Sequence, residues 1–214
     1  MLTIKTLVMN MICENCHIVN DESHEAVIID CGAYSPRDKQ LMAAYIEKAQ
    51  LRVKHHLCTH THFDHTFGCG FVAQEYGAAP EFHSADTPLY HTMKEQTMNF
   101  LGIPCEDNMP GAGRLLEDGD EISFGTHRLK VIHTPGHTPG GICFYCEEEK
   151  ILFSGDSLFH RSIGRTDLPG GNHTALIKSL TDKILTLPSD TKVYPGHGEP
   201  TTIATERNSN PYLI

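Results

Sequence analysis

The order of the predicted elements indicates an α/β fold in which helices face two packed sheets, a four-layer αββα sandwich. Strand-like segments open the chain, helices and strands alternate through its middle, and a run of strands precedes a last helix and strand. Each element must bury one apolar face, so sheets in this order need helices on their outer sides. No repeat or low-complexity tract interrupts the 214 residues, and we expect residues 1–214 to form one domain.

The first half of the chain begins with short strands and continues with alternating helices and strands. Apolar, β-branched runs broken by polar turns predict the strands. Proline at position 36 is typical of the first turn of a helix. These signals place strands at Leu2–Met9, His17–Asn20, Ala26–Asp30, Val53–Thr59 and Pro80–His83, and helices at Pro36–Gln50, at Gly68–Tyr76 after a start near His65, and at about Thr87–Leu101.

The second half opens with a loop rich in glycine, proline and aspartate, Pro104–Gly113. The remainder of the chain has mostly the pattern of strands, with one long helix near the end. We expect strands at Glu121–Phe124, His127–His133, Gly141–Tyr145, Ile151–Phe153 and Lys192–Tyr194, and the helix at about Thr174–Leu187.

Composition is that of an ordinary soluble protein, with 39% hydrophobic and 21% charged residues. The formal net charge of −10 argues against nucleic acid and anionic membranes as partners, and Lys and Arg are scattered. No stretch approaches the ~20 apolar residues of a membrane span, and the N-terminus does not resemble a signal peptide. We expect a cytoplasmic protein that acts on a small molecule; the sequence does not indicate its oligomeric state.

Eight cysteines in a chain without an export signal favour reduced thiols over a disulfide framework. Two Cys-x-x-Cys pairs, Cys13/Cys16 and Cys143/Cys146, raise the alternative of a zinc ribbon. Both pairs lie in strand-like segments, where positions i and i+3 point to opposite faces, and neither has a glycine between the cysteines. We therefore expect buried or half-buried thiols.

The most informative motif is the string from 60 to 65, which places three imidazoles and one carboxylate within six residues. Such crowding is costly unless a divalent metal binds it. Three later candidates each follow a predicted strand and adjoin a glycine, so they can converge at one rim of a sheet scaffold. Together the seven candidates suffice for two metal ions: His60, His62, Asp64, His65, His137, Asp156 and His197.

The alternative is a histidine-rich surface loop beside unrelated acids, since ten of the 15 histidines fall outside the pattern. Histidines at i, i+2 and i+5 around a carboxylate fit coincidence poorly. Other histidines have simpler interpretations: His55 and His56 lie inside a strand and are expected to be packed or solvent-facing. His83 and His133 are either unrelated to the site or orient its ligands.

The ordered set of motifs resembles the metallo-β-lactamase superfamily over nearly the whole chain. The resemblance implies that His60, His62 and His137 hold a first metal ion, while Asp64, His65 and His197 hold a second. It also implies that Asp156 bridges both ions, and that Asp64 orients the nucleophile. The implied cofactors are two divalent metal ions, with zinc first and iron or manganese as alternatives.

Such a centre is suited to hydrolysis. Two cations ~3.5–4 Å apart lower the pKa of a water held between them, which provides hydroxide at neutral pH. One cation polarises a carbonyl and stabilises the oxyanion. If the leaving group is a thiolate with a pKa near ~8.5, little proton donation is required.

Further strings resemble the short, single-domain glyoxalase II-like group, which implies hydrolysis of a thioester such as S-lactoylglutathione to a hydroxy acid and a thiol. In that group the equivalent of Asp30 supports the site from behind. Arg165 either contacts a substrate carboxylate or pairs with Asp167, and Tyr145 either offers a substrate-side hydroxyl or packs in the core. The strings are Glu14-Asn15-Cys16, Ile28-Ile29-Asp30-Cys31-Gly32, His133-Thr134-Pro135-Gly136-His137-Thr138, Ser154-Gly155-Asp156-Ser157-Leu158-Phe159 and Gly164-Arg165-Thr166-Asp167.

The chain stops soon after His197, so we expect no C-terminal helical glutathione-binding domain. The alternatives are a mononuclear iron persulfide dioxygenase on the same fold, a lactonase or esterase, and a metal-binding scaffold without activity. The complete ligand set counts against the scaffold. A β-lactamase is disfavoured, because such enzymes typically carry a Cys or another ligand near the position of Asp156.

Overall fold

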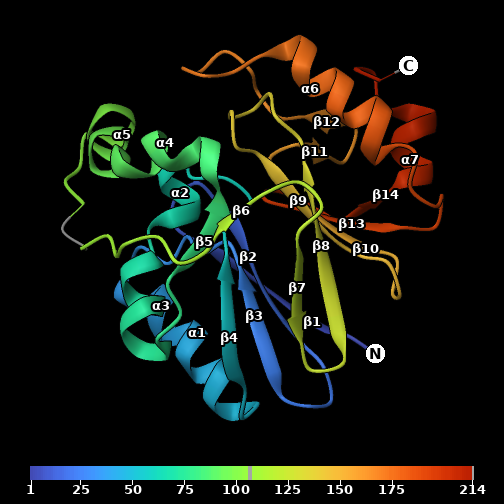
Figure 1. Ribbon diagram of the computed structural model, residues 1–214. Coiled ribbons are helices and arrows are strands. Elements are labelled where there is room, and N and C mark those ends of the chain that lie inside the picture. The colour runs from blue at the N-terminus through green and yellow to red at the C-terminus, as the bar shows by residue number, and fades with distance from the viewer. Residues whose placement is uncertain (106–107, 214) are drawn as a thin grey trace.

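The computed structural model describes residues 1–105 and 108–213 and shows two packed sheets between two groups of helices (Figure 1). The first sheet has the strand order β1-β2-β3-β4-β5-β6, and the second has the order β14-β13-β10-β9-β8-β7. A small two-stranded sheet, β11-β12, lies beside the second. The predicted αββα sandwich is confirmed.

The strands of the first sheet are β1 (Thr3–Met9), β2 (Glu14–Asn20), β3 (Glu25–Ile29), β4 (Arg52–Leu57), β5 (Pro80–His83) and β6 (Leu115–Leu116). Those of the second are β7 (Glu121–Phe124), β8 (His127–His133), β9 (Ile142–Cys146), β10 (Ile151–Gly155), β13 (Lys192–Pro195) and β14 (Thr201–Thr202), and the small sheet is β11 (Leu158–Phe159) with β12 (Ser162–Ile163). The α-helices are α1 (Pro36–Lys48), α2 (Phe63–Thr66), α3 (Cys69–Tyr76), α4 (Thr87–His91), α5 (Met93–Leu101), α6 (His173–Ser179) and α7 (Ile203–Ser209), with short 3₁₀ and π segments η1 (Ser84–Asp86) and η2 (Leu180–Ile184).

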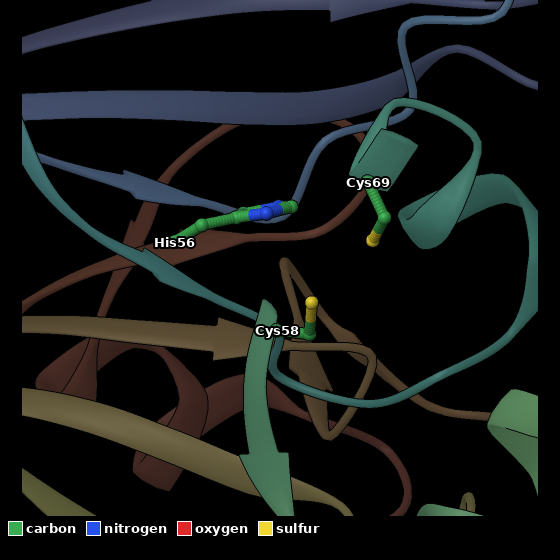
Figure 2. A group of neighbouring side chains, drawn as sticks. All are labelled: His56, Cys58 and Cys69. Atoms are coloured by element: carbon green, nitrogen blue, oxygen red, sulfur yellow. The ribbon is translucent and has the colours of Figure 1, made fainter. Parts of the chain in front are cut away.

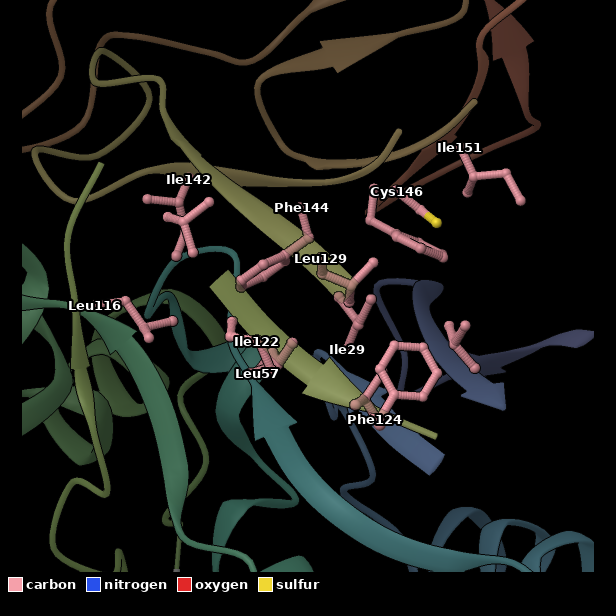
Figure 3. Close-up of a cluster of buried hydrophobic side chains, with 14 residues drawn as sticks. Ile29, Leu57, Leu116, Ile122, Phe124, Leu129, Ile142, Phe144, Cys146 and Ile151 are labelled. Carbon is pink, nitrogen blue, oxygen red and sulfur yellow. The ribbon is translucent and has the colours of Figure 1, made fainter. Parts of the chain in front are cut away.

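Alternating side chains build the three apolar layers. On β3, Val27 and Ile29 face the other sheet, while Ala26 and Ile28 face α1 and α3. On β9, Phe144 joins the layer between the sheets, and Tyr145 packs toward α6. Figure 3 shows the central layer, where Ile29 and Leu57 of the first sheet meet aromatic and aliphatic side chains of the second.

Strand direction brings two sheet edges to one place. In the first sheet β3, β4 and β5 are parallel, so their carboxyl ends share one edge. In the second sheet β8 and β10 are both antiparallel to β9, and β13 is parallel to β10, so these three strands also end together. Two backbone hydrogen bonds join the edges, from Ile142 N to Thr59 O at 2.8 Å and from Asn15 N to Gly196 O at 2.7 Å.

Helix α1 begins where predicted because Ser35 and Asp38 form a capping box around Pro36. It ends two residues earlier than predicted, with Gln50 in a left-handed conformation. Asp30 also differs from the prediction, since it leaves the strand with a positive φ of 55°. No helix among the described residues is long and apolar enough to cross a membrane.

Several predicted elements are divided, and some short ones were missed. The helical region at 87–101 breaks at Thr92 into α4 and α5, and the predicted helix at 174–187 becomes π-helical after Ser179. Helix α7 and the two-residue strands β6, β11, β12 and β14 were not predicted. The predicted loop Pro104–Gly113 includes positions 106–107, which lie outside the described residues.

The cysteine prediction holds for three members of the two Cys-x-x-Cys pairs. Cys16, Cys143 and Cys146 are buried, and Cys143 and Cys146 lie on opposite faces of β9. Cys13 is exposed, because it occupies the turn before β2 with a φ of 62°, so the prediction is wrong there. No disulfide joins cysteines within the described ranges.

Candidate metal centre

The histidine motif forms the connection from β4 to α2. Leu57 and Cys58 are buried in the sheet, and the chain then turns so that Asp64 and His65 fall in the first turn of α2. Asp30, at the end of the neighbouring strand, fixes this turn. Its carboxylate accepts hydrogen bonds from Thr59 N at 2.7 Å and from Thr59 Oγ1 at 2.8 Å.

Two groups of three ligand atoms lie side by side at the meeting of the sheet edges. In each group the atoms lie within 4.8 Å of one another. In the first, His62 Nδ1 is 2.9 Å from His137 Nε2. In the second, His197 Nε2 lies 3.3 Å from His65 Nε2 and 3.2 Å from Asp64 Oδ2. The groups are His60, His62 and His137, and Asp64, His65 and His197.

Asp156 lies between the two groups, on the turn that follows β10. Its Oδ1 is 3.5 Å from His65 Nε2. Its Oδ2 is 3.6 Å from His137 Nε2 and 3.8 Å from His197 Nε2. The carboxylate therefore faces imidazoles of both groups, as a bridging ligand must. The structure brings all seven predicted ligand side chains together.

The ring nitrogens that point away from the centre are held by the protein. His65 Nδ1 lies 3.0 Å from Asp30 Oδ2, an ion-pair contact without hydrogen-bond geometry, which agrees with the predicted supporting role of Asp30. His137 Nδ1 lies 2.8 Å from the carbonyl of Arg165, and His197 Nδ1 lies 3.2 Å from the carbonyl of Cys13. Such outer contacts fix the tautomer and direct the other nitrogen inward, as is usual for histidines that bind metal.

Electrostatics at the centre divide the histidines. Burial lowers the pKa of His62 to about 4, and the nearby His137 adds to this effect. Burial also lowers the pKa of His60 well below its ordinary value. Burial opposes the charge on His65 as well, but the carboxylates of Asp64 and Asp156 outweigh it and raise its pKa. His60 and His62 are therefore neutral and able to donate a lone pair.

The carboxylates remain ionised despite their burial. Burial favours the neutral form of Asp156, yet the nearby charge of His65 lowers the pKa of Asp156 well below the usual range. The pKa of Asp64 is lowered in the same way, since the charge of His65 and the hydrogen bond from His197 outweigh burial.

The donor set fits a pair of divalent cations. His60 Nε2 and Asp156 Oδ1 are buried and have no hydrogen-bond partner. Unpaired polar atoms of this kind are costly, and a cation would satisfy them together with the closely approaching nitrogens. Five imidazoles and two carboxylates suit zinc, iron or manganese, so the donor types do not select one metal.

A glycine makes room for the second group. A Cβ added at Gly196 would lie 2.4 Å from Asp156 Oδ1 and 2.7 Å from His65 Cε1. Only a residue without a side chain lets the loop after β13 approach the two ligands so closely. Proximity of this glycine to the site was predicted from the sequence, and the structure confirms it.

A cavity of about 280 Å³ opens on the centre and is lined by five of the ligands. A second, largely apolar cavity of about 360 Å³ adjoins it, and His62, Phe100 and Leu168 line both. Arg165 lines the first cavity, but its guanidinium forms two hydrogen bonds of 2.8 and 2.7 Å with Asp167. The predicted pairing of Arg165 with Asp167 is confirmed, and a contact with substrate stays a prediction.

Three other predicted residues do not join the centre. Tyr145 is 6% exposed and packs in the apolar layer under α6, on the outer face of the second sheet, so the prediction of a substrate-side hydroxyl is wrong. His83 and His133 stack on each other with ring centroids 3.9 Å apart. Nδ1 of His83 accepts a hydrogen bond from Ala85 N, and Nε2 of His133 lies 2.9 Å from the carbonyl of Pro139. The alternative that these two histidines are unrelated to the metal ligands is therefore the correct one.

Asp86 is a supporting residue that the sequence did not reveal. This buried carboxylate accepts hydrogen bonds from Thr61 N at 3.1 Å, from Thr138 Oγ1 at 2.9 Å and from Gly140 N at 2.6 Å. It therefore joins the loop that carries His60 and His62 to the loop that carries His137. A lone Asp before a helix resembles an N-cap, and only its position just after β5 distinguishes it.

Glu14 and Asn15 support the loop that carries His197. The Asn15 amide donates to the carbonyls of Pro195 and Gly198, at 3.0 and 2.9 Å. Glu14 is completely buried, which raises its pKa well above the usual value, and its Oε2 accepts a hydrogen bond from Gly32 N. Both residues belong to a string that carried the family resemblance, but no role was predicted for either of them.

The fold and the centre together define an αββα protein with a histidine- and aspartate-rich metal site, and comparison with known proteins agrees. Residues 14–197 match the Metallo-beta-lactamase superfamily. Over 201 residues the chain is 35% identical to hydroxyacylglutathione hydrolase GloC of Haemophilus influenzae, covering 94% of this chain and 92% of that protein. The chain belongs to the metallo-β-lactamase superfamily and is a metallo-hydrolase of it.

Two solved structures are similar over nearly their whole length. The BLEG-1 B3 metallo-beta-lactamase superposes with a TM-score of 0.89 at 36% identity, covering 99% of this chain and 100% of that one. The di-iron-bound form of TTHA1623 superposes with a TM-score of 0.85 at 36% identity, with the same coverage.

Proposed function

We propose that this chain hydrolyses a thioester, of the S-lactoylglutathione type, at a centre of two divalent metal ions. The main support is the pair of adjoining ligand groups with Asp156 between them. The likeness to hydroxyacylglutathione hydrolase GloC supports the reaction class. The cytoplasmic location, the single domain and the absence of nucleic-acid or membrane partners remain predictions from the sequence.

The proposed ligand sets follow the geometry: His60, His62 and His137 would hold one ion, Asp64, His65 and His197 the other, and Asp156 would contact both. Bound cations would supply Lewis acidity and a water of lowered pKa. The protein fixes the donors in advance, because Asp30 and two backbone carbonyls hold the outer nitrogens of three histidines.

The residues of this chain would position the reactants. Asp64 lines the cavity, and its carboxylate can orient an attacking water by accepting a hydrogen bond. A departing thiolate needs little protonation near neutral pH, which agrees with the lack of a Lys or Tyr among the described residues that line this cavity. The adjoining apolar cavity, which Leu89, Phe100 and Pro169 line, offers a surface for the rest of the substrate.

The test is steady-state hydrolysis of S-lactoylglutathione and of simple acyl thioesters, followed by loss of thioester absorbance. We expect turnover that a chelator abolishes and that zinc, iron or manganese restores. His62→Ala should lose both metal and turnover, while Tyr145→Phe should keep both. Full activity in a metal-free, chelator-treated protein would refute the proposal.

Two competing activities belong in the same experiment. The likeness to a B3 metallo-beta-lactamase favours testing a chromogenic cephalosporin as a second candidate substrate. A persulfide dioxygenase would bind a single iron and consume O₂ with glutathione persulfide. Hydrolysis of the cephalosporin alone, or oxygen uptake with one iron per chain, would replace the thioesterase assignment.

A further inference from the structure

A second cluster of metal-ligating side chains lies outside the histidine- and aspartate-rich centre. His56 belongs to β4, Cys58 follows that strand, and Cys69 begins α3. One ring nitrogen and the two sulfur atoms lie within 4.8 Å of one another. Figure 2 shows the imidazole and both thiols directed toward a common space between the strand and the helix.

The cluster is completely buried, and its imidazole has no partner. His56, Cys58 and Cys69 each have 0% exposure. Neither ring nitrogen of His56 forms a hydrogen bond, and the thiols of Cys58 and Cys69 are both free. An unpaired buried donor or acceptor destabilises a fold, so an imidazole in this position indicates a missing ligand.

The donors of this cluster are softer than those of the first centre. Two sulfurs and one imidazole are soft ligands that favour zinc or cuprous ions over magnesium, calcium or manganese. Two thiolates and a neutral imidazole around a divalent cation leave no net charge, which suits an interior without water. With Zn–S near ~2.3 Å and Zn–N near ~2.0–2.1 Å, ligand atoms of one site lie about 3.5–3.8 Å apart. A contraction of at most about 1.3 Å from the observed limit of 4.8 Å would therefore form the site.

We propose that His56, Cys58 and Cys69 form a second, structural metal site that takes a soft cation, Zn²⁺ or Cu⁺. Binding of Zn²⁺ would release both thiol protons and form two metal–sulfur bonds, whereas Cu⁺ would need the release of only one thiol proton to leave the site without net charge. The site would join the end of β4 to the start of α3, the two ends of the segment that carries the histidine motif. Because the cluster has no exposed atom, we expect the cation to enter as the chain folds.

Cobalt substitution tests this site independently of the first. The histidine centre contains no sulfur, so a thiolate-to-cobalt charge-transfer band in the near ultraviolet arises outside that centre, and its loss in Cys58→Ala and Cys69→Ala would assign it to these two cysteines. Protein produced with cobalt should show the band and bind one more equivalent of metal than Cys58→Ala or Cys69→Ala. The band should persist in His62→Ala, and in Cys146→Ala as a matched buried cysteine of the core.

Metal analysis of protein isolated from cells distinguishes zinc from copper. A second, anaerobic preparation supplemented with copper tests whether the site binds Cu⁺. Folding is checked by circular dichroism, and Cys58→Ser or Cys69→Ser replaces an alanine variant that does not fold. Folded wild-type protein without the band, and without copper bound in the anaerobic preparation, would overturn the proposal. A Cys58–Cys69 disulfide in the isolated protein, found by peptide mapping, would overturn it as well.

Discussion

Removal of the Asp86 carboxylate should loosen both loops that hold the first ligand group. In Asp86→Ala, Thr61 N–H and Gly140 N–H lose their acceptor in a buried position. Each unsatisfied buried donor costs about 1–3 kcal/mol, so we expect a loss of about 2–6 kcal/mol in the free energy of unfolding. That is a large share of the ~5–15 kcal/mol that stabilises a typical domain.

The assay is urea unfolding of metal-free protein, followed by a metal titration of the same variant. Metal-free conditions separate the effect on the fold from any effect of ligation. Asp190→Ala is the matched control, because Asp190 is an exposed aspartate paired with Lys150, and its loss should change stability by less than ~0.5 kcal/mol. An Asp86→Ala protein as stable as the control, with unchanged metal affinity, would contradict the supporting role of Asp86.

Three single positions give further predictions. Burial lowers the pKa of His17 to about 4, so its neutral form stabilises the fold above pH ~6.5, and this contribution falls as the pH drops toward 4. His17→Gln should therefore reduce the change in the free energy of unfolding between these pH values by ~3 kcal/mol, measured by urea unfolding. An unchanged pH profile would contradict the lowered pKa of His17. Gly196→Ala should abolish binding of one metal ion because its Cβ would meet Asp156, whereas Gly111→Ala, in open space, should bind metal normally; equal metal content in both would be the contrary result. Tyr145→Phe should leave kcat/KM for any accepted substrate within a factor of about two, and a tenfold loss would return Tyr145 to the site.

The sandwich was predictable because the long strands and α1 carry strong local signals. Pro36 and the capping pair fix the start of α1, and alternation along β3 and β9 fixes which side chains face which layer. The two-residue strands and α7 were missed because their formation depends on partners elsewhere in the chain. Thr201, for example, pairs with Val193 of β13.

The ligands of the candidate site were predictable because they stand in compact motifs, but the residues around them were not. Asp86 lies 52 positions from Thr138, and Asn15 lies 180 positions from Pro195, so only the meeting of the two sheet edges brings each pair together. Tyr145 shows the opposite error. The resemblance to the glyoxalase II-like group suggested a role for Tyr145, but strand alternation turned its side chain to the far face of the sheet.

Anomalous diffraction from crystals grown with zinc would locate the ions of the candidate centre. We predict two neighbouring peaks, one among His60, His62 and His137, and one among Asp64, His65 and His197, with Asp156 touching both. A map in which these side chains surround no anomalous peak, while zinc occupies other places, would show that they do not form a two-metal centre.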